Sequence, residues 1–181
     1  MPSPVGHCLI GLGSAQLVHR GRTRLILLAV ILITAIAPDF DFIPGLLIGD
    51  INRFHHGPSH SIGFALAYAL LGALLLRFNS DFRHFRSTFT LLLVVYLSHL
   101  LADLMSVDHG APYGIPLLWP ISDQYLISPV SLFMKIEHGP YGGDTATVMA
   151  NIFSWHNLIA VTVEFIVAAP LLWLCQRRRD T

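Results

Sequence analysis

Long apolar stretches separated by short polar segments dominate the chain. Four of them predict hydrophobic helices, at residues 25–37, 62–76, 88–104 and 158–175, and a weaker fifth covers residues 5–18. Most are shorter than the roughly 20 apolar residues that span a bilayer. The pattern predicts an all-α bundle of about five helices, four main ones and an N-terminal one, whose polar ends meet something other than lipid.

The composition places this bundle in a membrane. Hydrophobic residues make up 54% of the chain and charged residues only 12%, whereas about a quarter of the residues of soluble domains are charged. We expect one membrane-embedded domain over residues 1–181, with the Gly- and Pro-rich segment 107–155 as a long outer loop. The lipid bilayer is then the expected partner. The net charge of zero gives no reason to expect binding to nucleic acid.

Basic residues give the expected orientation. Nine of the eleven Lys and Arg residues form three clusters, and even numbers of predicted crossings separate them. The clusters are Arg20, Arg22 and Arg24, then Arg77, Arg83 and Arg86, then Arg177, Arg178 and Arg179. By the positive-inside rule all three face the cytoplasm. We therefore expect a multi-pass protein of a bacterial inner membrane, with segments 38–61 and 107–155 on the periplasmic side.

The five predicted helices carry polar groups at similar depth. His7, Asp39, His60, His99 and Glu164 each lie 13 to 17 residues from the nearest clustered arginine. At the rise of an α-helix this is about 20 to 25 Å from the basic side. Because ionisable groups at such depth normally face a bundle interior or a watery cavity, the spacing predicts a polar pocket in the outer leaflet that opens outward.

Two motifs in segment 38–61 suit metal binding. In "PDFD", Asp39 and Asp41 would point to the same side of an extended backbone and share a cation. In "HHGPSHS", His55 and His60 flank a Gly-Pro turn that lets both rings converge, and imidazole is the commonest protein ligand of zinc. A turn with helix caps, or histidines that anchor a loop, are the structural alternatives.

The motif "SHLLAD" adds two further donors, because His99 and Asp103 lie four residues apart and share one helix face. The predicted metal ligands then number seven: His7, Asp39, Asp41, His55, His60, His99 and Asp103. Since one tetrahedral ion uses four, the set predicts two zinc ions, with manganese or iron as alternatives.

Other residues are candidates for roles around these metals. Whichever of Asp39 and Asp41 is not committed to metal is the expected general base, and His56 and His109 are expected to contact substrate or leaving group. Glu164 and His156 lie on nearly one face of the last helix, where they would complete the pocket or bind a further ion, unless Glu164 pairs with a histidine. Trp119 is expected to be an interfacial anchor or part of a lid.

The motifs "GH", "PDFD", "HHGPSHS", "YLSHLLAD" and "YGIPLLWP" occur in this order over residues 6–121. Together they resemble the YdjM-like family of LexA-regulated, membrane-bound, metal-dependent hydrolases. The resemblance implies metal-ligand positions at His55 and His60. Family members usually carry an arginine where this chain has His56, and a protonated His56 is expected to take its place.

A more distant similarity is to zinc-dependent phospholipases C and single-strand nucleases. Their bridging Asp, their His and their His-x3-Asp-x5-His arrangement look like Asp41, His55, and His99, Asp103 and His109. Their later His-x3-Glu/Asp pair has no counterpart, because position 160 is Ala.

The leading hypothesis is a hydrolase in which metal-activated water attacks a phosphoester or lipid-linked substrate, with the oligomeric state left open. The alternative is a metal-binding or ion-transporting membrane protein without hydrolytic activity, because intramembrane His and carboxylate groups also mark ion paths. The almost purely apolar inner halves of the helices indicate a blind pocket and favour the enzyme. A third possibility is a metal that only clamps the helices.

Overall fold

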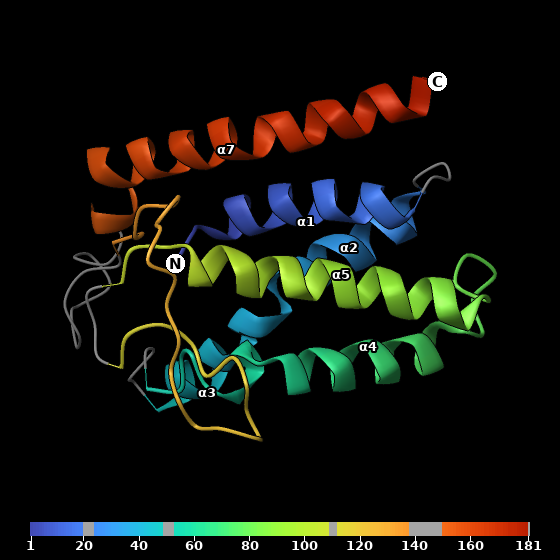
Figure 1. Ribbon diagram of the computed structural model, residues 1–181, viewed down its shortest axis with the longest axis horizontal. Coiled ribbons are helices and arrows are strands. Elements are labelled where there is room, and N and C mark those ends of the chain that lie inside the picture. Colours follow the sequence, from blue (N-terminus) through green and yellow to red (C-terminus); the bar gives the residue numbers. More distant parts are fainter. Residues whose placement is uncertain (20–23, 49–52, 109–111, 138–149, 181) are drawn as a thin grey trace.

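The computed structural model describes residues 1–19, 24–48, 53–108, 112–137 and 150–180, the last range without side chains beyond residue 173. All regular elements in these ranges are helical (Figure 1). They are α1 (Pro4–Val18), α2 (Leu25–Ile36), α3 (Phe42–Leu47), α4 (Ile62–Leu76), α5 (Phe85–Leu104) and α7 (Trp155–Asp180), with two 3₁₀ turns, η1 (Ala37–Asp41) and η2 (Pro58–His60). The predicted all-α bundle is confirmed.

The chain differs from the prediction at Pro38, where we expected the second helix to stop. It instead continues through η1 into α3, so that Leu25–Leu47 forms one apolar helical stretch of 23 residues. Proline is tolerated here because it sits at the start of η1, where its missing N–H removes no hydrogen bond. The consequence is that the "PDFD" carboxylates lie on a tight helical turn and not on an extended strand.

Small residues bring the helices close together. In Figure 1, α1 lies between α5 and α7, and α4 lies along the other side of α5. A Cβ atom added to Gly11 of α1 would lie 2.7 Å from the Cβ of Ala35 in α2. Fully buried Ala65, Ala69 and Ala73 recur every four residues along α4. Such small residues allow the close backbone approach that is typical of membrane helices.

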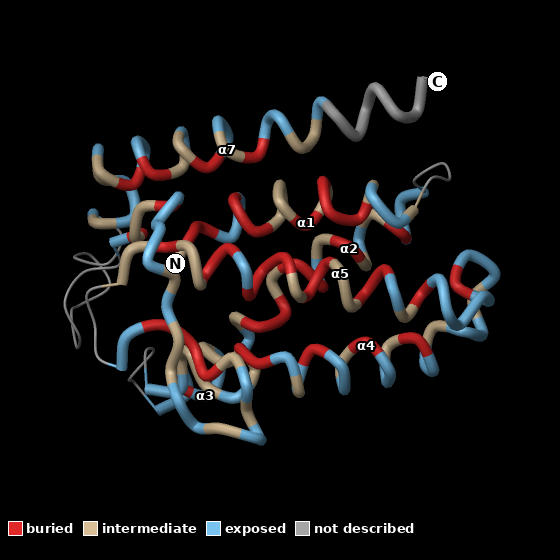
Figure 2. The backbone as a smooth tube through the Cα atoms, in the orientation of Figure 1, coloured by how far each residue is buried: buried red, intermediate tan, exposed pale blue. Residues whose placement is uncertain are grey.

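The outer surface of the bundle is apolar. Figure 2 shows α4 with its buried side toward α5 and its exposed side turned away; the exposed side carries Leu66, Leu70 and Leu74. Three described helices are long and apolar enough to cross a membrane: Leu25–Leu47, Phe85–Leu104 and Trp155–Trp173. An apolar surface of this kind fits the hydrocarbon interior of a membrane. Helices suit this environment because their backbone N–H and C=O groups are hydrogen-bonded within the helix.

Basic residues gather at one end of the bundle. Here, Arg24 before α2 donates to Asp81 in the α4–α5 turn at 2.6 Å, and the C-terminal end of α7 lies at this same end in Figure 1. Arg77 and Arg83 flank that turn, while Arg20 and Arg22 lie outside the described residues. The opposite end holds the N-terminus, η1 and η2.

The long segment after α5 covers the end that holds η1 and η2. Its described parts are mostly irregular, as expected, and backbone hydrogen bonds tie them to the helices. Ser128 N–H donates to the Leu104 carbonyl at 2.9 Å, and Ile62 N–H donates to the Leu117 carbonyl at 2.9 Å. The Trp119 carbonyl lies 2.6 Å from where a Cβ of Gly63 would be. This segment therefore rests directly on the start of α4, with the Trp119 side chain half-buried.

Candidate metal centre

Four side chains from three elements converge beneath this end of the bundle. Asp39 comes from η1, His60 from η2, and His99 and Asp103 from the last turns of α5. One donor atom from each lies within 4.8 Å of the other three. We call these four residues the donor group. The i,i+4 spacing on α5 brings Nε2 of His99 to 3.0 Å from Oδ2 of Asp103, as the sequence predicted.

The spacing of these atoms fits a four-coordinate metal ion. Zinc held by nitrogen and oxygen at about 2.0–2.1 Å in a tetrahedron separates its ligands by about 3.3–3.4 Å. Nε2 of His60 lies 3.4 Å from Oδ2 of Asp103, 3.6 Å from Oδ1 of Asp39 and 3.4 Å from Nε2 of His99. Nε2 of His99 lies 3.6 Å from Oδ1 of Asp39. The distances between donor atoms, including 3.0 Å between His99 and Asp103, therefore lie on both sides of the ligand separation in a tetrahedral zinc site.

Hydrogen bonds at the far side of each ring direct the Nε2 lone pairs into the donor group. Nδ1 of His99 lies 2.8 Å from the Ala35 carbonyl, which can only accept, so Nδ1 carries the proton. Nδ1 of His60 lies 3.1 Å from the Ser59 hydroxyl, which itself donates to Asp41, and 3.1 Å from Oδ2 of Asp41. A carbonyl or carboxylate that holds the Nδ1 proton is the usual partner of a metal-binding histidine, because it fixes the tautomer and the ring.

The carboxylates of the donor group lack hydrogen-bond partners of normal geometry. All four carboxylate oxygens of Asp39 and Asp103 are buried and accept no hydrogen bond within the described part of the chain. Buried charges without a partner are costly, and metal binding needs the histidines neutral, with their Nε2 lone pairs facing these oxygens. A cation between them removes both the desolvation penalty and the repulsion, so the residues fit a divalent metal.

Asp41 lies outside the donor group, although we predicted it as a ligand on the same side as Asp39. Successive residues of a 3₁₀ turn are about 120° apart, so two residues separated by one point to different sides. Nδ1 of His55 donates to Oδ1 of Asp41 at 3.1 Å, and Nδ1 of His60 lies 3.1 Å from its Oδ2. The Ser59 hydroxyl donates to it at 3.0 Å. Its contacts orient the histidines.

The carboxylates also favour positive charge on His60. Burial acts to lower the pKa of this ring, but the nearby carboxylates of Asp39 and Asp41 outweigh it and raise the pKa to about 9, so a metal that binds Nε2 of His60 must displace a proton. His56 behaves in the opposite way, since burial and then the neighbouring His55 lower its pKa to about 3. At neutral pH, His56 therefore lacks the charge that we expected in place of an arginine.

His7 approaches the donor group from α1. Its ring is buried, stacks on His99 with centroids 3.7 Å apart, and places Nε2 at 3.4 Å from Oδ1 of Asp103. Neither ring nitrogen of His7 has a hydrogen-bond partner among the described residues. Asp103 therefore presents one oxygen to the donor group and the other to His7.

The remaining predicted histidines lie beside the donor group or outside the described residues. His55, His56 and His60 each place one ring nitrogen within 4.8 Å of the other two. The ring of His55 stacks on Phe42 at 3.9 Å. His56 has a φ of 59°, a strained backbone for a residue other than glycine, and its buried Nε2 has no partner in the described structure. His109 lies outside the described residues.

The two candidates on α7 have partners other than metal donors. Glu164 is fully buried, and Ser3 N–H donates to its Oε1 at 2.6 Å, so it meets α1 and not a histidine. The Ser-Pro pair at the start of α1 signals a helix cap, but sequence reasoning did not connect Ser3 with Glu164. His156 donates to the Lys135 carbonyl at 2.8 Å and ties the outer segment to α7.

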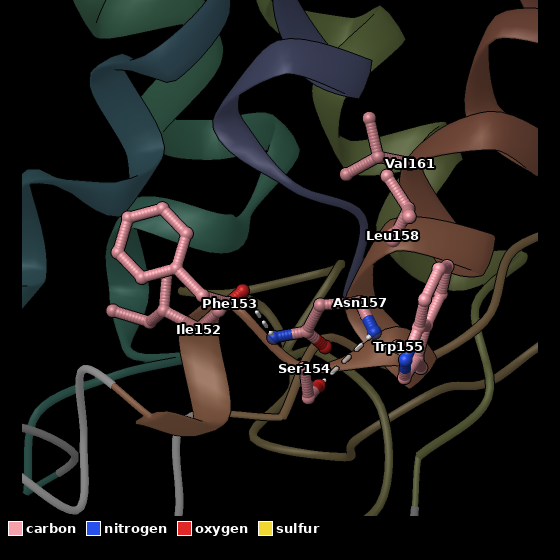
Figure 3. Close-up of a pocket in the computed structure, with 7 residues that line it drawn as sticks. All are labelled: Ile152, Phe153, Ser154, Trp155, Asn157, Leu158 and Val161. Carbon is pink, nitrogen blue, oxygen red and sulfur yellow. Dashed lines mark hydrogen bonds between the residues drawn. The ribbon is translucent and has the colours of Figure 1, made fainter.

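The site is more closed than the predicted outward pocket. The side chains of His7, His60, His99 and Asp103 are fully buried, while Asp39, Asp41 and His55 are 10–11% exposed and form its edge. A separate open hollow of about 350 Å³ lies at the start of α7 (Figure 3). Its lining, which includes Trp155 and Asn157, contains no predicted ligand.

Comparison with known proteins places the whole chain in a family. The family model described as YdjM inner membrane protein matches residues 1–179. No curated protein and no solved structure gives a significant match. The family description and the three apolar helices of spanning length agree on a membrane location.

Proposed function

The chain belongs to the YdjM inner membrane protein family, and we propose that this member is a metal-dependent hydrolase whose active site is the donor group. One observation carries the proposal: Asp39, His60, His99 and Asp103 converge at tetrahedral spacing, with both histidine tautomers set for coordination. Zinc binds donors of these types, and a catalytic zinc keeps one of its four positions for water. Of the four donors only Asp39 is partly exposed, so Asp39 is the ligand that would give way to water; four permanent ligands would instead fit a metal that only clamps the helices.

The donor group would hold one divalent ion, with zinc first and manganese or iron as alternatives. A second ion would need more than His7 and Asp103, which offer it only two donor atoms. His55, His56 and His60 are the other described residues that bring three donor atoms within 4.8 Å of one another, so we propose the second ion of the expected two-zinc site there. When bound, such ions supply Lewis acidity that polarises a phosphoryl or carbonyl oxygen and makes water more acidic.

The surrounding residues orient the ligands and exclude water. Asp41 holds His60 and His55 through their Nδ1 atoms, and the Ala35 carbonyl holds His99. In this proposal Asp41 is not a metal ligand, but both of its oxygens already accept hydrogen bonds, from His55 and Ser59. Asp39 would turn one oxygen, Oδ1, to the metal, so its second oxygen is the proposed general base. Its Oδ2 has no hydrogen-bond donor among the described residues and is available to hold a proton. His56 and His109 remain proposed contacts to substrate or leaving group.

The exposed edge supports a lipid-linked phosphoester as the substrate. At this edge, the ring of Phe42 stacks on His55. Phe42 opens α3, whose Ile43, Leu46 and Leu47 are exposed and belong to the candidate span Leu25–Leu47. An apolar surface in the bilayer thus borders the partly exposed carboxylate of Asp41. A phosphate group carried by an acyl or isoprenoid chain would reach the edge from the periplasmic leaflet.

The first test is the metal content of the detergent-purified protein, measured by elemental mass spectrometry. We expect two zinc-class ions per wild-type chain and their loss from His99→Ala and Asp103→Ala. His84→Ala is the matched control, because this exposed histidine lies in the turn before α5 at the other end of the bundle. A wild-type chain purified without chelator that holds no metal would contradict the proposal.

Hydrolysis is tested separately on the metal-loaded protein. Bis(p-nitrophenyl) phosphate serves as a soluble probe, and vesicles of phosphatidylethanolamine and phosphatidylglycerol serve as a lipid probe. We expect turnover in the wild type and its loss in both ligand variants. Full metal occupancy without turnover of either probe would favour the alternative of metal binding or ion transport without hydrolysis, which the complete burial of His60, His99 and Asp103 also fits.

A further inference from the structure

The long segment after α5 carries an apolar turn at residues 116–121, which we call the apolar turn. Its outward side is not polar: Leu118 and Pro120 are exposed, and Ile121 is 93% exposed. Three further apolar side chains of the segment are exposed: Ile127, Val130 and Leu132. Apolar side chains that gather on a surface mark a contact with protein or membrane, so the apolar turn requires a partner.

The backbone of the apolar turn presents few free N–H groups. Pro116 and Pro120 have none. The N–H groups of Leu117, Trp119 and Ile121 donate to carbonyls of the same segment at 2.8 Å, 3.0 Å and 2.9 Å. Irregular backbone is tolerated near hydrocarbon only where its polar groups have partners within the protein. The apolar turn meets this condition.

The apolar turn lies in an almost uncharged part of the chain. Asp123 is the only charged side chain among residues 112–134, and this stretch contains no histidine. A lipid phosphate would therefore find no basic side chain here. Contact with a membrane would come from apolar area and not from attraction to anionic headgroups.

The helix beside the apolar turn is too short to cross a membrane. α4 has 15 residues, which make about 22 Å at the rise of an α-helix, whereas the hydrocarbon core is about 30 Å thick. Arg77 directly follows α4, and a charged side chain keeps that end at the membrane surface. The missing length of about 8 Å is therefore at the other end, where α4 begins with Ile62.

The apolar turn packs on this first turn of α4. Ile62 N–H donates to the Leu117 carbonyl at 2.9 Å. A Cβ on Gly63 would lie 2.6 Å from the Trp119 carbonyl oxygen and 2.9 Å from Cδ of Pro120. Figure 1 shows the yellow part of the segment beside the start of α4. The apolar turn thus extends the apolar outer surface of the bundle beyond the first residue of α4.

We propose that the apolar turn is inserted among the lipid acyl chains of the leaflet on the side away from the arginine-rich end, with Ile121 in contact with lipid. Its continuity with the exposed apolar face of α4 favours lipid over a protein partner. Insertion would supply the apolar surface that the short α4 lacks. It would also hold the outer segment against the start of α4, directly after η2. The proposal requires neither metal binding nor hydrolysis.

The experiment places an NBD fluorophore on single cysteines in a Cys8→Ser, Cys175→Ser background, reconstituted in phosphatidylcholine vesicles. Ile121→Cys reports on the apolar turn. Gln124→Cys, exposed three residues later, is the matched polar control, and Leu70→Cys on the exposed face of α4 is the control for lipid contact. Lipids brominated near the headgroup end of their acyl chains quench from the membrane, and iodide on both sides quenches from water.

We expect brominated lipids to quench Ile121→Cys about as strongly as Leu70→Cys and severalfold more than Gln124→Cys. Iodide should give the reverse order. Addition of phosphatidylglycerol should leave the quenching of Ile121→Cys unchanged, because no basic side chain holds the apolar turn to the headgroups. Since Ile121 is so exposed, its replacement should leave the unfolding temperature at that of the background.

Three results would overturn the proposal. Quenching of Ile121→Cys by iodide alone would place the apolar turn in water, and protection from both quenchers would mean that a protein, for example a second copy of this chain, covers it. Lipid quenching that requires phosphatidylglycerol would mean that headgroup charge holds the segment. Because no metal is needed, a chain that binds no zinc but shows the expected quenching would refute the proposed function and support the insertion.

Discussion

Oδ2 of Asp41 lies 3.1 Å from Nδ1 of His60, the ring nitrogen that faces away from the donor group. The donor group therefore depends on a carboxylate that is not one of its members. Oδ1 of the same residue lies 3.1 Å from Nδ1 of His55. Asp41 thus links the two histidines of the "HHGPSHS" motif, and the backbone turn between them brings both rings to one side chain.

Asp41→Asn should weaken metal binding without abolishing it. The amide has one acceptor oxygen where the carboxylate has two, so it cannot hold both His55 and His60 in the same way. Loss of such a partner typically costs about 10- to 100-fold in metal affinity, which chelator competition measures. Asp103→Asn, which alters a ligand, should cost more. If Asp41→Asn costs as much as Asp103→Asn, then Asp41 is itself a ligand.

Metal removal should destabilise the wild type and leave a ligand variant unchanged. An ion present at about 100 times its dissociation constant adds about 2.7 kcal/mol to the free energy of unfolding. A chelator should therefore lower the thermal midpoint of the wild type in detergent by several degrees. It should have no effect on His99→Ala, which starts without metal. An equal decrease in both proteins would mean that the chelator acts elsewhere.

The sequence predicted those parts of the site that a single helix determines. His99 and Asp103 meet because four residues make about one turn, and α4 has the expected bounds because Ser61 caps its first turn. The sequence could not show that Asp39 joins the donor group while Asp41 orients the histidines. That difference depends on whether the backbone after Pro38 is extended or helical. Nor could the sequence pair Ser3 with Glu164, because 161 residues separate them and only the packing of α1 against α7 joins them.

Packing between α1 and α2 should influence the metal site through Ala35. A Cβ on Gly11 would lie 2.7 Å from the Cβ of Ala35, whose carbonyl holds Nδ1 of His99. Gly11→Ala should push the two helices apart, cost about 1–3 kcal/mol of stability and weaken zinc binding. Thermal unfolding and zinc titration measure the two effects.

Gly72→Ala is the matched control for this substitution. Its Cβ would meet only Cδ1 of Leu92, at 2.7 Å, and this end of a flexible side chain can move aside. We expect zinc affinity to remain at the wild-type value. A fall in affinity as large as in Gly11→Ala would show that the site responds to any disturbance of the bundle and not to Ala35.

The orientation of the bundle can be tested by labelling single cysteines from either side of the membrane. Ser80 lies in the α4–α5 turn near Arg77 and Arg83, and Gln124 lies in the outer segment; both are exposed. Since basic loops stay in the cytoplasm, a membrane-impermeant maleimide added to intact cells should label Gln124→Cys but not Ser80→Cys. Both variants carry Cys8→Ser and Cys175→Ser, and permeabilised cells should label at both positions. The reverse pattern would place the donor group on the cytoplasmic side and exclude a substrate from the periplasmic leaflet.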